Sequence, residues 1–308
     1  AAGFIGSRLV AALAQSGVDV TAVDAFTDGG DGERKRDAAR ALDASVGVAV
    51  ERLDLADAAE VRLDDVDVVY HLAGRPGVRT SWGDGVDDHL RGNVIATLRL
   101  VEAIATSKTV RRVVYASSSS VYGNALAHPT SEDARPRPVS PYGLTKLSAE
   151  RILGTLGRPD GPSVVALRYF TVYGPGQRPD MALHRLFEAA LTRSPFPRFG
   201  DGSQVRDLTY VDDVVAATIA AGAADVSGVR AVNVAGGSAV SLTQLIDAVG
   251  SLVGAEVPVD PRAAARGDVR QTSGSTERAR DLLDWRPHVD LDEGLARQLA
   301  WHREGRTR

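Results

Sequence analysis

The sequence predicts an α/β fold in which helices cover both faces of a mostly parallel sheet. Three observations lead to this prediction. Apolar, strand-like runs alternate with helix-like segments along most of the chain. A glycine-containing turn at Gly3 and Gly6 opens the first helix-like segment, and Asp24 ends the next strand-like run, about 20 residues past the glycines. This spacing is typical of a Rossmann-type, doubly wound sheet that binds a dinucleotide.

Composition excludes several classes of protein. With 308 residues, 44% of them hydrophobic, the chain can bury a large core and form one large domain or two modest ones. A net charge of -4 argues against a nucleic-acid partner or an anionic membrane surface. The most apolar run, residues 214–224, is shorter than the ~20 residues of a spanning helix. The chain has no cysteine, which excludes disulfides and fits a cytosolic protein.

The chain begins inside the glycine motif. Its first residues, Ala1-Ala2-Gly3-Phe4-Ile5-Gly6, match the last two thirds of Gly-x-x-Gly-x-x-Gly. We therefore expect that the first glycine and a central strand lie upstream of the given sequence. Gly3 lets the backbone approach a pyrophosphate, and Gly6 lets the following helix pack close to the strand.

A helix is predicted over residues 7–16 and a strand over residues 18–23, which leads to Asp24. A carboxylate at this place accepts hydrogen bonds from the adenosine ribose and repels a 2′-phosphate. We therefore predict NAD and not NADP. The stretch 28–36 is rich in glycine and charge, which predicts a mobile loop.

The next elements continue the alternation. Strands are predicted over residues 48–53 and 67–74, and the apolar residues of 84–108 recur at helical spacing. His71 lies in the second of these strands. We interpret it as a core or strand-end histidine and not as a ligand.

The stretch from residue 117 to residue 146 carries the strongest chemical signal. A strand predicted over 112–116 runs into four serines, which places their hydroxyls at the carboxyl end of the sheet, where ligands bind. Tyr142 and Lys146 follow with the spacing Tyr-x-x-x-Lys, one turn apart on a helix face. An ammonium beside a phenol favours the phenolate, so a tyrosine with a pKa of roughly 10 becomes a base near neutrality. The chain has only three lysines, so Lys146 is not generic surface charge.

The remaining elements are predicted less regularly. A strand over 163–169 is followed by three prolines that interrupt the pattern, with a helix over 181–191 between them. A strand over 230–234 precedes Ser241-x-x-Gln244, which predicts a capping box at the start of a helix.

Ser118, Tyr142 and Lys146 resemble the catalytic triad of the extended short-chain dehydrogenase/reductases, specifically the nucleotide-sugar epimerases and dehydratases. The resemblance covers essentially the whole chain. It implies an NAD-binding domain of residues 1–167, to which 205–235 returns, and an interleaved, smaller nucleotide-sugar-binding domain of 168–204 and 236–308. It also implies a homodimer, in which the helix of 84–108 and the helix carrying Tyr142 pair with their copies in a second subunit.

The resemblance assigns most of the cofactor contacts. Asp54 and Leu55 correspond to the adenine-contacting pair, the segment 72–74 passes beside the phosphates and ribose, and Asn93 supports the active-site lysine through water. The complete predicted NAD site is Gly3, Phe4, Ile5, Gly6, Asp24, Asp54, Leu55, Leu72, Ala73, Gly74, Asn93, Tyr142 and Lys146. No metal site is predicted.

Three kinds of activity fit this resemblance. In an epimerase, NAD⁺ takes a hydride from C4 of the sugar, Tyr142 removes the 4-hydroxyl proton, Ser118 hydrogen-bonds the same oxygen, and the hydride returns to the opposite face. A dehydratase or decarboxylase would use the same scaffold. A non-catalytic NAD-binding regulator is the third reading, and the intact triad argues against it.

The residues after Ser118 separate the first two activities. Dehydratases of the family carry an Asp-Glu pair there, and decarboxylases carry a glutamate before Val-Tyr-Gly. This chain has Ser119 and Ser120, which cannot act as carboxylates. The sequence therefore predicts an epimerase.

The substrate prediction comes from arginines and one threonine. Arg206 and Arg266 match the pair that clamps the diphosphate of a UDP-sugar, with Asp268 beside them, and Arg79 is a candidate for a phosphate contact. Thr171 stands where galactose-type epimerases usually have asparagine. Together with the segment 172–182, it resembles the UDP-glucuronate 4-epimerases. UDP-glucose/UDP-galactose 4-epimerase is the alternative.

A UDP-glucuronate 4-epimerase must hold the substrate carboxylate, because its 4-keto intermediate is a β-keto acid that loses CO₂ readily. The resemblance places Ser119, Ser120 and Thr171 near C5 and C6 of the sugar, and Arg178 is the candidate for a charged donor. The other reading of Arg178 is a loop arginine that closes the interface between the domains.

Overall fold

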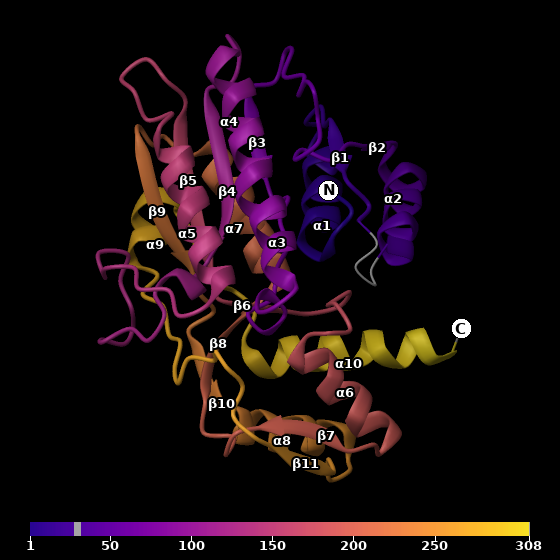
Figure 1. Cartoon of the computed structure of the whole chain (residues 1–308). Coiled ribbons are helices and arrows are strands. Elements are labelled where there is room, and N and C mark those ends of the chain that lie inside the picture. Colours follow the sequence, from indigo (N-terminus) through magenta and orange to yellow (C-terminus); the bar gives the residue numbers. More distant parts are fainter. Residues whose placement is uncertain (28–31, 308) are drawn as a thin grey trace.

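The structure, a computed structural model, describes residues 1–27 and 32–307. Its main sheet is parallel, with the strand order β3-β4-β5-β9 (Figure 1). A separate parallel pair, β1 and β2, lies beside α1. The parallel α/β architecture confirms the predicted fold class. The bounds of these strands are β1 Ala22–Asp24, β2 Val50–Arg52, β3 Val68–His71, β4 Arg112–Ser118, β5 Ser163–Tyr169 and β9 Val229–Val234.

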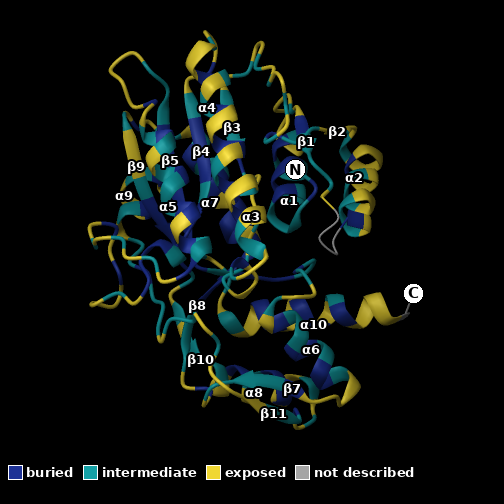
Figure 2. Ribbon diagram, in the orientation of Figure 1, coloured by how far each residue is buried: buried dark blue, intermediate teal, exposed yellow. Residues whose placement is uncertain are grey.

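Two helical layers sandwich this sheet, as the alternation of side chains along β4 requires. Val113 and Tyr115 point to one face and pack with Leu153 of α5 (Pro141–Gly154) and residues of α4 (Ala96–Thr106). Val114 points to the other face and packs in the cluster that contains α7 (Val211–Ala223). Figure 2 shows the buried residues concentrated in β4 and β5. Helix α9 (Glu277–Leu283) packs beside β9.

A second group of elements gathers at the carboxyl end of the main sheet (Figure 1). Strands β6, β8 and β10 form a mixed sheet, and β7 pairs with β11. Their bounds are β6 Thr171–Tyr173, β7 Phe196–Phe199, β8 Val205–Tyr210, β10 Ser238–Ser241 and β11 Val259–Arg262. The helices of this group are α6 (Ala182–Thr192), α8 (Leu242–Val253) and α10 (Leu291–Thr307).

The predicted helix over 84–108 is interrupted. It consists of α3 (Gly85–His89), a π-helical segment η2 (Leu90–Ile95) and α4. A π-helical turn admits a wider backbone loop and is frequent at functional sites. Here it carries Asn93, which is almost completely buried.

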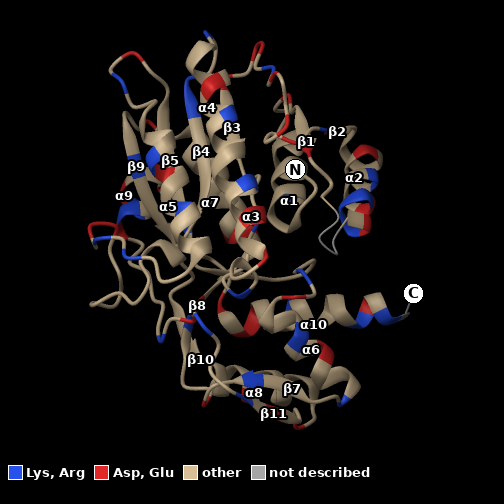
Figure 3. Cartoon of the chain, in the orientation of Figure 1, with Lys and Arg blue, Asp and Glu red and all other residues tan. Residues whose placement is uncertain are grey.

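The loop predicted over 28–36 is partly wrong. Residues 28–31 lie outside the described part of the chain, but Gly32–Val46 forms α2. Its Glu, Arg and Lys residues are good helix formers, and this propensity wins over the charge density that suggested a loop. Figure 3 shows acidic and basic residues interspersed on α2 and α10.

Other predictions agree closely with the structure. The strand over 163–169 is β5, and the first helix, α1 (Phe4–Gln15), begins three residues earlier than predicted. The capping box is present, since Ser241 Oγ accepts a hydrogen bond from the Gln244 amide at 3.1 Å and Gln244 Oε1 accepts one from the Ser241 amide at 2.9 Å. Within the described residues, none of the helices combines the length and the apolar character needed to cross a bilayer.

Candidate active site

Three serine hydroxyls lie at the carboxyl end of β4. Ser118 is the last residue of the strand, and the chain then turns into a short 3₁₀-helix, η3 (Ser119–Val121). Ser118 Oγ accepts a hydrogen bond from the Ser120 amide at 3.1 Å, which fixes the turn. Ser119 and Ser120 consequently lie beside Ser118 at the mouth of the sheet.

Helix α5 brings Tyr142 and Lys146 to the same place. Ser140 caps the helix, because its Oγ accepts a hydrogen bond from the Gly143 amide at 3.1 Å, and Pro141 occupies the first turn. Tyr142 therefore lies in the first turn and Lys146 one turn later. Lys146 Nζ donates to the carbonyl oxygen of Ala116 on β4 at 2.8 Å, so the lysine is tied to the strand that delivers Ser118.

Burial shapes the protonation of both groups. It lowers the pKa of Lys146 to about 8, against the opposing charge of Glu150. It raises the pKa of Tyr142, although a hydrogen bond to Ser118 and the positive charge of Arg178 act in the other direction. Burial of the hydroxyl is the largest of these effects on Tyr142.

Asn93 and Gly74 support the lysine from the other side. Asn93 Nδ2 donates to Thr145 Oγ1 at 2.9 Å, and its Oδ1 accepts a hydrogen bond from the Arg75 amide at 2.7 Å. A Cβ atom added to Gly74 would lie 2.6 Å from Asn93 Oδ1 and 3.2 Å from Lys146 Nζ. A glycine is therefore required where the segment 72–74 passes the catalytic helix.

The predicted dinucleotide residues fit the cofactor. Gly3 is the N-cap of α1, and a Cβ built on it would meet no atom within 4 Å, so a phosphate can approach the helix N-terminus. A Cβ on Gly6 would lie 2.5 Å from the carbonyl oxygen of Ala1, which explains this glycine by close packing. The neighbouring Phe4 and Ile5 form the first turn of α1.

Asp24 lies at the end of β1, where a ribose acceptor is expected. Its Oδ2 accepts a hydrogen bond from the Ala2 amide at 3.0 Å, and its Oδ1 forms an ion pair with Lys35 at 3.1 Å. Burial raises the pKa of this carboxyl, and the charge of Lys35 acts in the other direction. Sequence reasoning missed Lys35, because the stretch that contains it was read as a loop.

The two adenine-contacting candidates differ in their surroundings. Asp54 Oδ2 accepts a hydrogen bond from Arg91 at 2.9 Å, so this carboxylate is already paired with η2. Leu55 is buried and offers an apolar surface. Leu72 and Ala73 lie between β3 and Gly74, at the carboxyl edge of the main sheet.

A cavity of about 140 Å³ collects five of the predicted substrate residues from distant parts of the sequence. They are Ser119, Ser120, Thr171, Arg206 and Asp268. A larger cavity of about 340 Å³ lies between α1 and α2 and reaches Gly3 and Phe4. None of the triad residues lines either cavity, but the smaller one contains the hydroxyls of the two serines that follow Ser118 in the chain.

Of the predicted diphosphate arginines, Arg206 lines this smaller cavity. Burial lowers the pKa of Arg206, against the nearby charge of Asp268. Arg79 donates to Asp268 Oδ2 at 2.8 Å and stacks 4.1 Å above the ring of Phe199. Arg266 stacks 3.9 Å above the ring of Trp82, a platform that sequence reasoning missed.

Arg178 and His71 each have a hydrogen-bonding partner within the protein. The Arg178 guanidinium forms two hydrogen bonds with Asp180, both of 2.9 Å. Burial raises the pKa of the Tyr142 hydroxyl, and the positive charge of Arg178 acts in the other direction. His71 is buried, its Nε2 lies 2.9 Å from Thr97 Oγ1, and burial lowers its pKa to about 3. The interpretation of His71 as a core residue is confirmed.

Comparison with known proteins shows that this chain is similar in sequence and fold to nucleotide-sugar epimerases. A sequence model of the "NAD dependent epimerase/dehydratase family" matches residues 1–235. A UDP-glucuronate 4-epimerase from Thermodesulfobacterium geofontis is 33% identical over 98% of this chain and 94% of its own length. The crystal structure of UDP-glucuronic acid 4-epimerase from Bacillus cereus, in complex with UDP-glucuronic acid and NAD, superposes with a TM-score of 0.93 at 36% identity, covering 98% of this chain and 97% of that one. MoeE5, in complex with UDP-glucose and NAD, has a TM-score of 0.87 at 42% identity, covering 99% and 97%.

Proposed function

We propose that this chain, which belongs to the NAD dependent epimerase/dehydratase family, is an NAD-dependent 4-epimerase that interconverts UDP-glucuronate and UDP-galacturonate. The observation that carries the proposal is the cavity in which Ser119, Ser120 and Thr171 face Arg206. It joins neutral hydroxyl donors to a diphosphate-binding arginine at the end of β4. The relatives from T. geofontis and B. cereus, both named as UDP-glucuronate 4-epimerases, support the same activity.

The residues of the triad divide the proton chemistry. The Tyr142 oxygen accepts the 4-hydroxyl proton and later returns it to O4, so the enzyme releases no proton overall. Ser118 Oγ donates a hydrogen bond to the same sugar oxygen. Lys146, held by the Ala116 carbonyl, keeps a positive charge beneath the tyrosine at neutral pH. NAD, when bound, supplies the reversible acceptance of hydride at C4 and the positive charge that Tyr142 needs.

The same pocket limits side reactions. Ser119 and Ser120 provide no carboxylate, so elimination of water from C5 and C6 lacks its acid and base. Thr171 and the two serines can donate hydrogen bonds to the substrate carboxylate, and Arg178 can add a charged donor. Held near the plane of the C4 carbonyl, the carboxylate does not leave as CO₂. These arguments favour epimerisation over dehydration and decarboxylation.

A UDP-glucose 4-epimerase is the second candidate. The observation that favours it is that the cavity lining is mostly neutral around Ser119, Ser120 and Thr171. MoeE5, whose structures are described in complex with UDP-glucose and with UDP-glucuronic acid, shares this fold at 42% identity and is compatible with both candidates. A neutral C6 hydroxymethyl group would fit the same hydroxyl donors.

One incubation separates these functions. We expect purified, NAD-loaded protein to convert UDP-glucuronate to UDP-galacturonate, and to convert UDP-glucose and UDP-xylose more slowly. Chromatographic resolution of the products from all three sugars provides the measurement. Formation of UDP-galactose with no UDP-galacturonate would return the UDP-glucose epimerase to first place, and a UDP-pentose as the main product from UDP-glucuronate would indicate a decarboxylase.

We propose further that the active unit is a homodimer. Three apolar side chains on η2 and α4 are substantially exposed, namely Leu90, Ile95 and Leu98, and Leu144 of the adjacent α5 is 56% exposed. Apolar residues grouped on neighbouring helices favour burial against a second copy.

We also propose a cytoplasmic location, which the absence of cysteine supports.

The proposed division into two domains is supported by strand pairing. Strand β9, within the segment 205–235, pairs with β5 of the main sheet, so the chain returns to the NAD-binding part. Strand β8, within the same segment, pairs instead with β6 and β10. We therefore place the return to the NAD-binding domain after β8, at the start of α7.

A further inference from the structure

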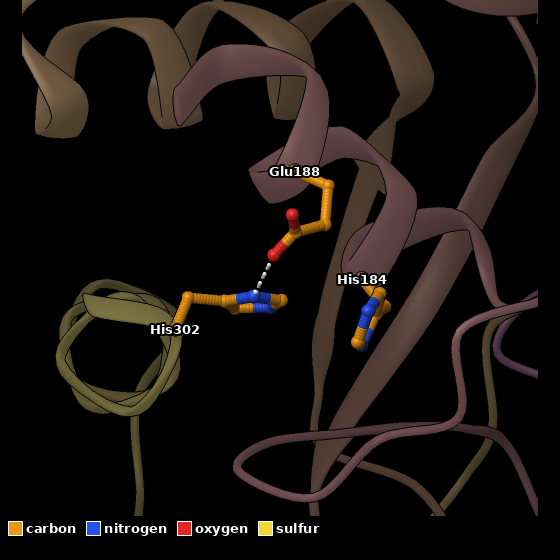
Figure 4. A group of neighbouring side chains, drawn as sticks. All are labelled: His184, Glu188 and His302. Carbon is orange, nitrogen blue, oxygen red and sulfur yellow. Dashed lines mark hydrogen bonds and ion pairs between the residues drawn. The ribbon is translucent and has the colours of Figure 1, made fainter. Parts of the chain in front are cut away.

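We propose that His184 and Glu188 of α6, together with His302 of α10, form a binding site for a divalent metal ion such as Zn²⁺ (Figure 4). None of these residues lines either of the two cavities described above, so the site is separate from the one that we assign to the sugar. The sequence predicts no metal site, because the three residues come from two segments that lie far apart in the chain. We call them the α6–α10 cluster.

The three side chains lie close to the distances that one metal ion requires. Each offers one ligating atom, and these atoms lie within 4.8 Å of one another. In a tetrahedral zinc site, bonds of about 2.0–2.2 Å hold the ligand atoms roughly 3.3 Å apart. Small rotations of the side chains would therefore close the cluster around an ion. In the part of the chain that the structure describes, no other group of three histidine, aspartate or glutamate side chains meets this condition.

Helix geometry brings the cluster together. His184 and Glu188 are four residues apart on α6, so their side chains lie on one face of the helix, one turn apart. Gln298 and His302 have the same spacing on α10, and both are buried. Gln298 ties α10 to the loop before α6, because its Nε2 donates to Gln177 Oε1 at 2.9 Å. This contact holds the two helices at the distance that the cluster needs.

The hydrogen bond of His184 prepares one of its nitrogens for a metal ion. Burial lowers the pKa of His184, which favours the neutral ring. Its Nδ1 lies 3.0 Å from the Gln177 carbonyl oxygen, which can only accept, so Nδ1 carries the proton and Nε2 keeps its lone pair. Metal-binding histidines usually donate their second nitrogen to a carbonyl or carboxylate oxygen in this way, which fixes the ring and its tautomer.

Glu188 and His302 supply the other two ligands. His302 Nδ1 lies 2.7 Å from Glu188 Oε1, and a metal ion can take the place of the proton between these atoms when that proton moves to Nε2. The second carboxylate oxygen, Oε2, lies 3.6 Å from Arg306, which holds the carboxylate from its outer side. His302 Nε2 is buried and has no hydrogen-bond partner among the described residues. Such an unpaired nitrogen costs free energy, which bonds from the ring to a metal ion would offset.

The surroundings of the cluster suit a bound ion. The ring of Phe187 lies 5.3 Å from that of His302, and the ring of Trp301 lies 4.8 Å from it, measured between centroids. Apolar rings of this kind limit the access of water to a metal site. The Glu188 side chain is 39% exposed, which leaves a path by which an ion can enter. Three protein ligands would leave the fourth position of a tetrahedral ion to water.

The test measures metal binding by the full, NAD-loaded chain, purified without a polyhistidine tag and dialysed first against a chelator and then against buffer. We expect Co²⁺ to produce visible absorption bands on binding, and Zn²⁺ to displace it at one ion per chain. The Kd of Zn²⁺ is measured by competition with a chromogenic chelator. Because the chain has no cysteine, sulfur ligands cannot account for the binding.

Two substitutions remove ligands at partly exposed positions, where the risk to folding is small. His184→Ala and Glu188→Gln should each weaken the binding of Zn²⁺ at least about tenfold. The matched controls are His128→Ala, at an exposed histidine outside the cluster, and Glu293→Gln, at a glutamate of α10 with an exposure comparable to that of Glu188. Both controls should leave the Kd unchanged.

Zinc should also stabilise the contact between α6 and α10. At a concentration about 100-fold above its Kd, we expect Zn²⁺ to raise the thermal unfolding midpoint of the wild type by about 5 °C, and that of Glu188→Gln by about half as much or less. Absence of Zn²⁺ binding, or binding that His184→Ala and Glu188→Gln do not weaken, would overturn the site and leave the cluster as a hydrogen-bonded contact between two helices. Turnover of UDP-glucuronate tests the proposed function separately.

Discussion

Burial shifts the pKa values of Lys146 and Tyr142, the two central residues of the site, in opposite directions. Lys146 loses part of its affinity for a proton inside the protein, and Tyr142 holds its proton more tightly than in water. The hydrogen bond from Ser118 and the charge of Arg178 compensate only in part. We propose that the positive charge of oxidised NAD, when bound, would favour the deprotonated form of Tyr142 and so couple NAD binding to base strength.

Substitution of the base gives the most direct prediction at this scale. Tyr142→Phe keeps the ring and its packing but removes the proton acceptor, so we expect turnover to fall ~10²–10⁴-fold. NAD content and the thermal unfolding midpoint should stay near wild type, and Ser118→Ala should cost less because the base remains. A near-normal rate in Tyr142→Phe would rule out the mechanism.

The shifted pKa of Lys146 predicts a pH dependence of stability. With a folded pKa of about 8 and an ordinary value of 10.5, the unfolded chain binds more protons at this site between those pH values. The contribution of Lys146 to the free energy of unfolding therefore increases as pH rises through this window. Urea unfolding of the cofactor-free protein at pH 8 and 9.5 should show this increase in the wild type relative to Lys146→Met. Parallel pH profiles for the two proteins would contradict the shift.

At the scale of elements, the site depends on close contacts between three features: the π-helical segment η2, the backbone at Gly74 and the capped start of α5. The π-helical segment η2 turns Asn93 inward, and the Gly74 backbone passes directly against it. The cap at Ser140 starts α5 at the position that brings Lys146 under the end of β4. Small shifts of any of these elements would move the lysine.

Gly74→Ala tests this packing. The new Cβ would lie 2.6 Å from Asn93 Oδ1, so the loop or the helix must move. We expect a loss of about 1–3 kcal/mol in unfolding free energy, as for other overpacked sites, together with weaker NAD binding. Gly154→Ala, in the last turn of α5 with no atom within 4 Å of the added carbon, is the control and should be neutral or slightly stabilising. Equal behaviour of the two variants would show that Gly74 is not sterically required.

At the scale of the whole molecule, the chain crosses between its two parts several times. After β5 it leaves the main sheet for β6 and α6, and it returns through α7 and β9 before the last helices. The cavity forms where these crossings meet the end of β4. Each part therefore contributes residues to this one cavity.

The proposed dimer is tested by its exposed apolar residues. We expect Leu98→Glu or Leu144→Glu to shift the protein from dimer to monomer in light scattering coupled to size-exclusion chromatography, because a buried charge would oppose association. The control is Leu126→Glu, since Leu126 is 91% exposed on a loop and should not affect the oligomeric state. A wild-type protein that is monomeric and fully active at assay concentration would contradict the dimer.

Features that depend on neighbouring residues could be predicted from local sequence. The serine run with Tyr142 and Lys146, the spacing of Gly3 and Asp24, and the capping box at Ser241 follow from helical and strand geometry, which acts over a few residues. The alternation of strands and helices predicted the parallel sheet for the same reason. Arg206, Asp268 and Thr171 were identified through resemblance, and the structure brings them into one cavity.

Ion pairs and stacking contacts between distant residues became evident only in the folded chain. Lys35 meets Asp24 because a predicted loop is a helix that folds back on β1, and Trp82 lies under Arg266, a residue far along the chain. Burial, which depends on the packing of all the elements, also raises the pKa of Tyr142 and lowers that of Lys146. Partners from distant segments leave no periodic pattern in a sequence, and desolvation is a property of the assembled fold, so neither could be predicted from local chemistry.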